Sequence, residues 1–194
     1  MTYDLICIGA SWGGFHAMRQ LLAELPDGIE QPIVLVQHRH PSSGASALPE
    51  LLAEQTRRPV RDVDDKMPIE EGTVYVAPAD YHLLVELGSF ALSVDERVQY
   101  ARPSIDVMFE SAADAYRERA IGVILTGANE DGAAGLARIK ARGGVAVVQD
   151  PSQAERRTMP DAAIAATAAD AVLPLDQIGP FLYGLCVRPA AVSK

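Results

Sequence analysis

The sequence Leu-Ile-Cys-Ile-Gly-Ala-Ser-Trp-Gly-Gly, residues 5–14, decides the fold. Its apolar first half predicts a short buried strand over residues 5–8, and its glycines predict a tight turn. Residues 15–25 follow with apolar side chains at helical spacing, and Pro26-Asp27-Gly28 closes that helix. A strand, a turn and a helix in this order are typical of the first unit of an α/β domain.

The same rhythm continues along the chain. Residues 33–36 are apolar without polar alternation, so this strand should be covered on both faces. Gly88-Ser89 is a two-residue hairpin signal, which leads us to expect an antiparallel section that interrupts a mainly parallel sheet. The other expected elements are helices over 48–55, 104–116 (capped by Ser104), 132–141 and 178–185, a helix that begins at Met159-Pro160, and strands over 73–77, 82–87, 90–94, 121–125 and 145–148.

This alternation predicts a doubly wound, Rossmann-like α/β fold in three layers, with a mainly parallel sheet and an antiparallel hairpin. The length of 194 residues suits a single domain over 1–194. In such sheets, ligands bind outside the carboxyl ends of the strands. The residues that follow the strands over 5–8, 33–36 and 121–125 are therefore the first to consider as a site.

Composition and charge exclude several classes of protein. The 48% of hydrophobic residues argues against disorder. The net charge of -9 argues against general affinity for nucleic acid, which needs a basic surface. Two small basic clusters, Arg57-Arg58 and Arg156-Arg157, are interpreted as solvated surface, with a contact for an acidic partner as the alternative.

The cysteines and the N-terminus bear on location. Cys7 and Cys186 are too few and too distant in sequence to indicate a disulfide framework or a metal site, so a reducing compartment is expected. The first residues lack a basic segment and a long apolar run, and no stretch reaches the length of a membrane span. We therefore expect a soluble cytoplasmic protein that does not insert into a membrane.

The first strand ends in Gly9-Ala10-Ser11-Trp12-Gly13, which matches the G-x-S-x-G turn that presents a nucleophilic serine between a strand and a helix. The alternative is a glycine-rich phosphate loop. Phe15-His16 stands where a phosphate loop has Lys followed by Ser or Thr, which argues against a nucleotide-binding protein. Ser11 is therefore the candidate nucleophile.

The second strand is followed by His38, which should face the same crevice as Ser11. A serine needs an adjacent base to be a good nucleophile, and an imidazole can supply it. A packed structural histidine is the alternative role for His38, and His40 could compete as the base. His16, inside a helix, and His82, in the hairpin region, are expected to be bystanders.

The third strand is followed by residues 125–132, which include Asp131. An aspartate here could be a helix N-cap, or it could orient the imidazole and stabilise its protonated form. Asn129 and Glu130 remain competing candidates for that role. The chain order Ser, His, Asp differs from the usual Ser, Asp, His order of α/β-hydrolases, so this chain does not resemble that superfamily.

These segments together resemble the catalytic domain of the chemotaxis protein-glutamate methylesterase (CheB) family. The resemblance covers nearly the whole chain in order. The matching motifs are Gly9-Ala10-Ser11-x-Gly13-Gly14, Gln37-His38, Tyr75-Val76-Ala77-Pro78, Arg102-Pro103-Ser104-Ile105-Asp106, Val123-Ile124-Leu125-Thr126-Gly127, Asp131-Gly132-Ala133, Gln149-Asp150-Pro151 and Met159-Pro160.

The resemblance implies a serine hydrolase that acts on glutamate γ-methyl esters of methyl-accepting chemotaxis receptors or related signalling proteins. Methanol is released, and certain receptor glutamines are also deamidated. The family's nucleophile, base and orienting carboxylate fall on Ser11, His38 and Asp131, and its oxyanion donors fall on the backbone N–H groups of Trp12 and Ala128. No metal or cofactor is implied.

Three features depart from the family. Trp12 stands where threonine is usual, and Thr126-Gly127-Ala128-Asn129 replaces the frequent Thr-Gly-Met-Gly. The first strand starts near residue 4, so we expect this chain to lack the phosphoacceptor receiver domain of regulated members. A non-catalytic module that keeps the fold and binds receptor or signalling partners is therefore the alternative function.

Overall fold

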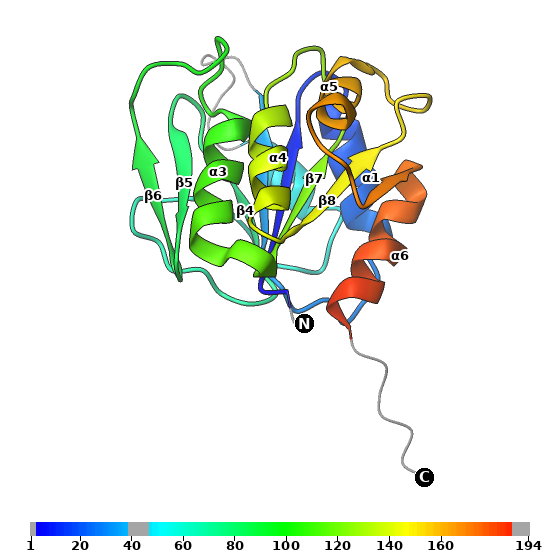
Figure 1. The fold of residues 1–194 in the computed structure, drawn as a ribbon. Helices are drawn as coiled ribbons and strands as arrows, with labels where there is room; N and C mark the ends of the chain where they lie inside the picture. Colours follow the sequence, from blue (N-terminus) through cyan, green and yellow to red (C-terminus); the bar gives the residue numbers. More distant parts are fainter. Residues whose placement is uncertain (1–2, 39–46, 188–194) are drawn as a thin grey trace.

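The computed structural model describes residues 3–38 and 47–187. Strands and helices alternate along most of this range (Figure 1). The strands are β1 (Leu5–Ala10), β2 (Ile33–Gln37), β3 (Val60–Asp62), β4 (Val74–Val76), β5 (His82–Glu86), β6 (Ser89–Ser93), β7 (Ala120–Ile124), β8 (Val145–Gln149) and β9 (Ala171–Leu173). The helices are α1 (Gly14–Glu24), α2 (Ala47–Ala53), α3 (Ile105–Tyr116), α4 (Ala133–Ala141), α5 (Thr158–Ala166) and α6 (Leu175–Cys186), with a 3-10 turn over Arg117–Arg119.

Seven strands form one parallel sheet in the order β3-β4-β2-β1-β7-β8-β9. The chain starts in the centre at β1, adds β2, the edge strand β3 and then β4 between them, and returns to build the other half outward from β7. Ala10 pairs with Gln37 of β2, and Gly9 pairs with Ile124 of β7, so these three strands end at the same edge. Between β1 and β7, the order in which strands are added to the sheet switches from one side to the other. Such sheets bind ligands at the carboxyl ends of the strands at this switch point.

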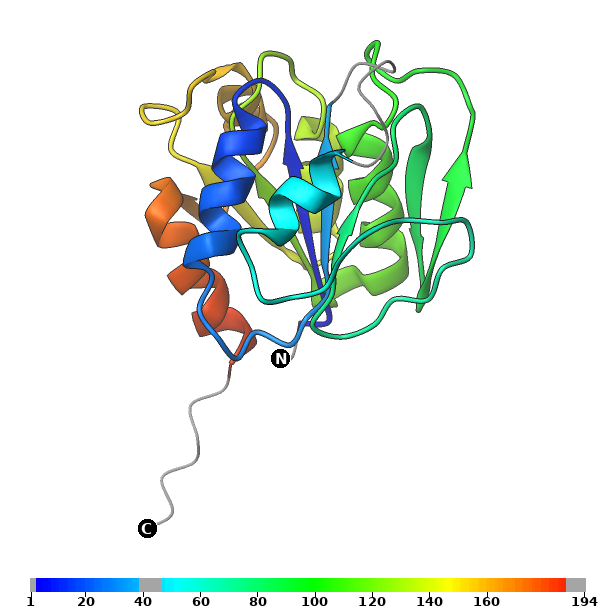
Figure 2. The same ribbon diagram turned by 180° about the vertical axis from the view of Figure 1, so that it is seen from behind.

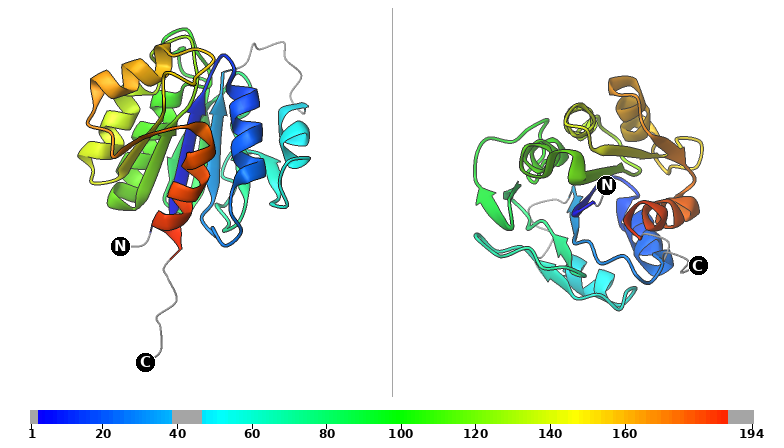
Figure 3. Two further views of the ribbon diagram at one scale, coloured as in Figure 1. Left: turned by 90° about the vertical axis from the view of Figure 1, so that its right-hand side faces the viewer. Right: turned by 60° about the horizontal axis from the view of Figure 1, so that its bottom comes forward.

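The sheet is the middle of three layers. Helices α3, α4 and α5 cover one face, and α1, α2 and α6 cover the other (Figures 1, 2 and 3). Two separate clusters of buried apolar side chains fill the two interfaces between the sheet and its helices. The predicted doubly wound fold is confirmed by this open sheet with helices on both faces, which buries the continuous apolar strands.

The antiparallel hairpin is confirmed, but its position differs from the expectation. β5 and β6 form a two-stranded sheet of their own, whereas β4 pairs in parallel with β2 and β3. The hairpin packs beside the main sheet through its side chains. The ring of Phe90 contacts that of Tyr75 edge to face, with 4.8 Å between the ring centroids. Val85 N–H also donates to Ser111 Oγ of α3 at 3.0 Å. Packing against α3 therefore decides the place of the hairpin, and the local turn signal cannot reveal it.

The cysteines are both free, and Cys7 is buried in the centre of β1. Burial raises the pKa of the Cys7 thiol, which makes it a poor nucleophile. Cys186 is only half-buried, at the end of α6. Within the described ranges, every helix is too short or too polar to cross a membrane.

Candidate active site

Ser11 follows β1 directly and lies in the predicted strand-turn-helix connection. Its N–H donates to Thr126 O at 3.0 Å, and its carbonyl accepts the N–H of Gly14 at 2.9 Å. Gly13 adopts a left-handed conformation with φ of 78°, which glycine tolerates without strain. A Cβ on Gly14 would lie 2.2 Å from the side-chain oxygen of Gln37, so the turn requires glycine there as well.

His38 lies beside this turn because the pairing of β1 with β2 continues past the end of β2. The His38 N–H donates to Ala10 O at 3.1 Å. The imidazole Nε2 lies 2.7 Å from Oδ2 of Asp131, which follows β7. The His38 side chain is 13% exposed and the Asp131 side chain is fully buried. The structure therefore brings two of the three predicted residues into direct contact across 93 positions of sequence.

Asp131 does not cap its own helix. Gly132 is the N-cap of α4, without a side-chain hydrogen bond, and the Asp131 carboxylate instead lies at the start of α3. Oδ1 accepts the Ser104 hydroxyl at 2.8 Å and the Asp106 N–H at 3.1 Å, while Oδ2 accepts the Ile105 N–H at 2.7 Å. The interpretation of Asp131 as an ordinary cap of its own helix was wrong, because these donors and His38 already engage both oxygens.

The charge of Asp131 follows from these contacts. Burial raises the pKa of this carboxyl, but the hydrogen bond with His38 and the N–H of Ile105 lower it more, so the net shift is downward. The carboxylate is thus ionised and can only accept hydrogen bonds. The His38 Nε2 must then carry the proton that it shares with Asp131, which leaves the lone pair on Nδ1.

The other candidates near the imidazole are placed as follows. The Asn129 side-chain nitrogen lies 3.4 Å from His38 Nδ1, the nitrogen that faces away from Asp131. Glu130 is exposed, and His40 lies outside the described residues.

Within the described part of the chain, the Ser11 hydroxyl makes no hydrogen bond, including none with His38. Catalytic hydrogen bonds of this kind often tighten only when substrate is bound.

The predicted oxyanion donors lie on either side of this turn. Trp12 comes directly after Ser11, and Ala128 follows the loop that Ser11 contacts through Thr126. Among the described residues, neither the Trp12 N–H nor the Ala128 N–H has an acceptor, whereas the N–H of Gly127 is bound to Arg156 O at 3.1 Å. Two free N–H groups beside a serine can stabilise a developing oxyanion.

A family model described as CheB methylesterase matches residues 6–182. The chain belongs to the CheB methylesterase family. A Leptospira interrogans protein (serovar copenhageni) that bears the provisional name protein-glutamate methylesterase/protein-glutamine glutaminase is 48% identical over 179 residues, which are 92% of each chain. The Caulobacter vibrioides protein-glutamate methylesterase/protein-glutamine glutaminase 2 is 37% identical over 92% of this chain and 53% of its own length. The CheB methylesterase catalytic domain of Thermotoga maritima superposes with a TM-score of 0.89 at 31% identity, and the match covers 95% of this chain and all of that one.

Two glutamines support the candidate site, and the sequence analysis did not assign them a role. Gln37 ends β2, and its side-chain nitrogen donates to the carbonyls of Ser11 at 2.7 Å and His38 at 3.1 Å. Gln149 ends β8, and its side-chain oxygen accepts the N–H of Thr126 at 2.8 Å. Both are buried polar residues at the last position of an apolar strand. That pattern is the signal that could have identified them, because a buried amide must find partners.

A second carboxylate lies behind the CheB site. Asp106 belongs to α3, but its Oδ1 accepts the N–H groups of Gly132 at 2.9 Å and Gly135 at 2.7 Å at the start of α4. Burial raises the pKa of Asp106 to about 6, and the nearby charge of Asp131 adds to this, although the N–H of Gly135 opposes it. Asp106 and Asp131 thus hold the starts of each other's helices.

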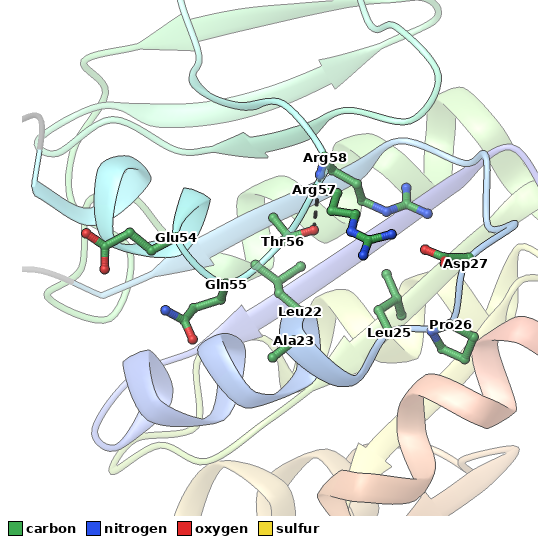
Figure 4. A pocket seen from close by; sticks show the side chains of 10 residues that line it. All are labelled: Leu22, Ala23, Leu25, Pro26, Asp27, Glu54, Gln55, Thr56, Arg57 and Arg58. Atoms are coloured by element: carbon green, nitrogen blue, oxygen red, sulfur yellow. Dashed lines mark hydrogen bonds between the residues drawn. The ribbon is translucent and has the colours of Figure 1, made fainter.

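The two basic clusters lie in different places in this CheB domain. Arg57 and Arg58 line a groove of about 520 Å³ between the end of α1 and the segment after α2, toward the amino ends of the strands (Figure 4). Arg58 is half-buried and donates to Ile29 O, so it is not simply solvated, and burial lowers the pKa of its guanidinium. Arg156 lies instead on the loop that contacts the predicted active site.

Proposed function

We propose that this CheB-family chain hydrolyses glutamate γ-methyl esters on methyl-accepting chemotaxis receptors or related signalling proteins, with Ser11 as nucleophile, His38 as base and Asp131 as the orienting carboxylate. The observation that carries the proposal is the 2.7 Å contact of His38 with buried Asp131 next to the Ser11 turn. The names of the relatives support the same activity.

The first half of the reaction forms an acyl-enzyme. The Ser11 oxygen attacks the γ-carbonyl carbon, and its proton passes to Nδ1 of His38, the nitrogen that is not committed to Asp131. The carbonyl oxygen becomes an oxyanion beside the N–H groups of Trp12 and Ala128. Collapse of this intermediate breaks the ester C–O bond, and the imidazolium returns the proton to the departing oxygen, so methanol leaves.

The second half restores the enzyme. His38 removes a proton from water, the resulting hydroxide attacks the acyl carbon, and the Ser11 oxygen leaves with the proton as a free glutamate carboxylate forms. Asp131 remains ionised and stabilises the imidazolium in both halves. The same steps with an amide substrate release ammonia, which would account for glutaminase activity.

Methanol release from a peptide that carries a glutamate γ-methyl ester tests the proposal. The wild-type chain should release methanol, and Ser11→Ala and His38→Ala should lose about 10³-fold or more of that activity. His16→Ala is the matched histidine control, because His16 is exposed on α1 and should be dispensable. Full activity in Ser11→Ala would end the proposal.

A serine-reactive fluorophosphonate separates the enzyme from the non-catalytic alternative. The enzyme should be labelled at Ser11, and His38→Ala should slow the labelling because the serine loses its base. A chain that binds receptor but is not labelled, and that releases no methanol, would support the adaptor function instead.

A further inference from the structure

Trp12 is an exposed aromatic residue that is nevertheless held in place. Its side chain is 58% exposed, although it directly follows the proposed nucleophile. The indole N–H donates to Glu155 Oε1 at 2.9 Å, across 143 positions of sequence. An exposed tryptophan with a fixed orientation is a preformed surface for a ligand, because little side-chain entropy is lost on binding.

Arg156 lies over this tryptophan. Its guanidinium carbon is 5.4 Å from the centroid of the Trp12 ring, which is within the range of a cation–π interaction. Its backbone is fixed to the active-site loop, since the Arg156 N–H donates to Thr126 Oγ1 at 2.8 Å and the Arg156 carbonyl accepts the N–H of Gly127 at 3.1 Å. The cation is therefore attached to the same loop that presents Ala128.

The Arg156 guanidinium has no acidic partner within the described residues, unlike its neighbour. Arg157 is paired with Asp161 at 2.6 Å, one helical turn further along. Glu155 gives one oxygen to the Trp12 indole and, among the described residues, forms no ion pair with Arg156. The chain carries a net charge of -9, so its overall electrostatic field repels acidic peptides. A cation without an acidic partner next to the proposed nucleophile opposes this repulsion locally.

We propose that Trp12 and Arg156 form a carboxylate-binding subsite that selects peptides with a free acidic side chain beside the esterified glutamate. Guanidinium groups bind carboxylates through two parallel hydrogen bonds, and the Trp12 ring limits the orientations that Arg156 can adopt. The inference rests on the proposed function and deepens it, since it names the class of substrate that the site prefers. The subsite acts on binding, so its loss should raise KM more than it lowers kcat.

Two methyl-ester peptides that differ only by Glu or Gln next to the ester test this specificity. The wild-type chain should favour the acidic peptide by about three- to tenfold in kcat/KM, with the difference mostly in KM and reduced at high salt. Arg156→Gln should abolish the preference. Arg157→Gln is the matched control and should keep it, because that side chain is paired with Asp161. Equal kcat/KM for the two peptides in the wild type, or an unchanged preference in Arg156→Gln, would overturn the inference.

Fluorescence gives a second measurement that does not need catalysis. Trp12 is the only tryptophan of the chain, so its emission reports on the subsite directly. An uncleavable peptide with a free glutamate should change this emission on titration, with about three- to tenfold weaker binding to Arg156→Gln than to the wild type. If no methanol is released but this binding difference is found, the proposed function fails while the subsite stands. Identical titrations of the two proteins would remove the subsite.

Discussion

The starts of α3 and α4 are held by two buried carboxylates whose pKa values are shifted in opposite directions. Asp131 lies just before α4 but accepts hydrogen bonds from the start of α3, and Asp106 belongs to α3 but accepts them from the start of α4. The two residues are 0% and 5% exposed. Nevertheless, the pKa of Asp131 is lowered and the pKa of Asp106 is raised to about 6.

The contacts explain the difference. Both carboxyls are penalised by burial, and both accept backbone N–H groups, but only Asp131 contacts an imidazole that can carry positive charge. Asp106 instead has Asp131 and Glu110 as negatively charged neighbours. Helix starts favour anions in general, but here the contact with a single histidine accounts for the opposite pKa shifts of two similar sites.

Asp131→Asn should have the largest effect. The side chain keeps one acceptor but loses its charge and places an NH₂ group among N–H donors, so we expect about 10³- to 10⁴-fold lower methyl-ester hydrolysis and about 2–4 kcal/mol lower stability. Because the folded-state pKa is below the ordinary value of 3.8, the charged form stabilises the fold above that pH. The stability difference, measured by urea unfolding, should therefore shrink as the pH falls below about 4.

Asp106→Asn should behave in the opposite way. The folded-state pKa of about 6 is above the ordinary 3.8, so protonated Asp106 stabilises the fold below about pH 4 and that contribution is lost as the pH rises through 6. Asparagine stays neutral and can still accept the N–H groups of Gly132 and Gly135. Relative to the wild type, the variant should gain stability by about 1 kcal/mol or more between pH 4 and pH 7 in urea unfolding.

Activity separates the two carboxylates further. Asp106→Asn should keep methyl-ester hydrolysis within about threefold of the wild type, since Asp106 holds a helix start and does not contact His38. A loss as large as that of Asp131→Asn would show that both carboxylates act on the imidazole and would end the contrast between them.

Ser104→Ala removes a hydrogen bond to Asp131 and should leave the contacts of Asp106 in place. The Ser104 hydroxyl donates to Asp131 Oδ1 at 2.8 Å and also caps α3 by accepting the Val107 N–H at 3.4 Å. We expect a loss of about 1–2 kcal/mol in thermal or urea unfolding and about two- to fivefold lower kcat. Ser111→Ala is the control, because Ser111 also bonds within α3 and to Val85 but does not contact Asp131. An equal loss of kcat in both variants would assign the effect to α3 and not to Asp131.

Gln99→Ala should have the smallest effect, because it removes one weak hydrogen bond to Asp106. The Gln99 side chain is exposed and donates to Asp106 Oδ2 at 3.3 Å. Its removal should raise the pKa of Asp106 slightly further and change stability by about 0.5 kcal/mol at neutral pH, with no change of kcat. The pH at which the stability difference between Asp106→Asn and its background stops growing should move upward from about 6, and a downward shift would contradict the assignment.

Much of the fold could be predicted because the inner strands must be apolar on both faces. β1, β2 and β7 are buried on both faces, so their sequences are continuous apolar runs that are easy to recognise. β3 and β9 were missed, since strands of three residues at the sheet edges leave no pattern to count. The position of the hairpin was also not predictable, because it depends on tertiary packing against α3 and not on the local turn.

The candidate site was predictable in outline and not in detail. Parallel strand ends meet at one edge, which is enough to bring His38 next to Asp131. The partners of the Asp131 carboxylate were not predictable, because the start of α3 reaches it through tertiary packing that leaves no local mark in the sequence. The contact of Asn129 with the imidazole likewise depends on how one loop folds. The role of Ser11 as nucleophile remains a prediction for the methanol assay.

The short edges of the sheet have a consequence for the behaviour of the protein at high concentration. β3 and β9 are the outermost strands, and each is only three residues long. β3 also carries Arg61 and Asp62, and charged side chains on an edge strand oppose the addition of a strand from another chain. Edge strands this short give another chain little backbone to pair with, which makes the sheet a poor template for amyloid-like growth.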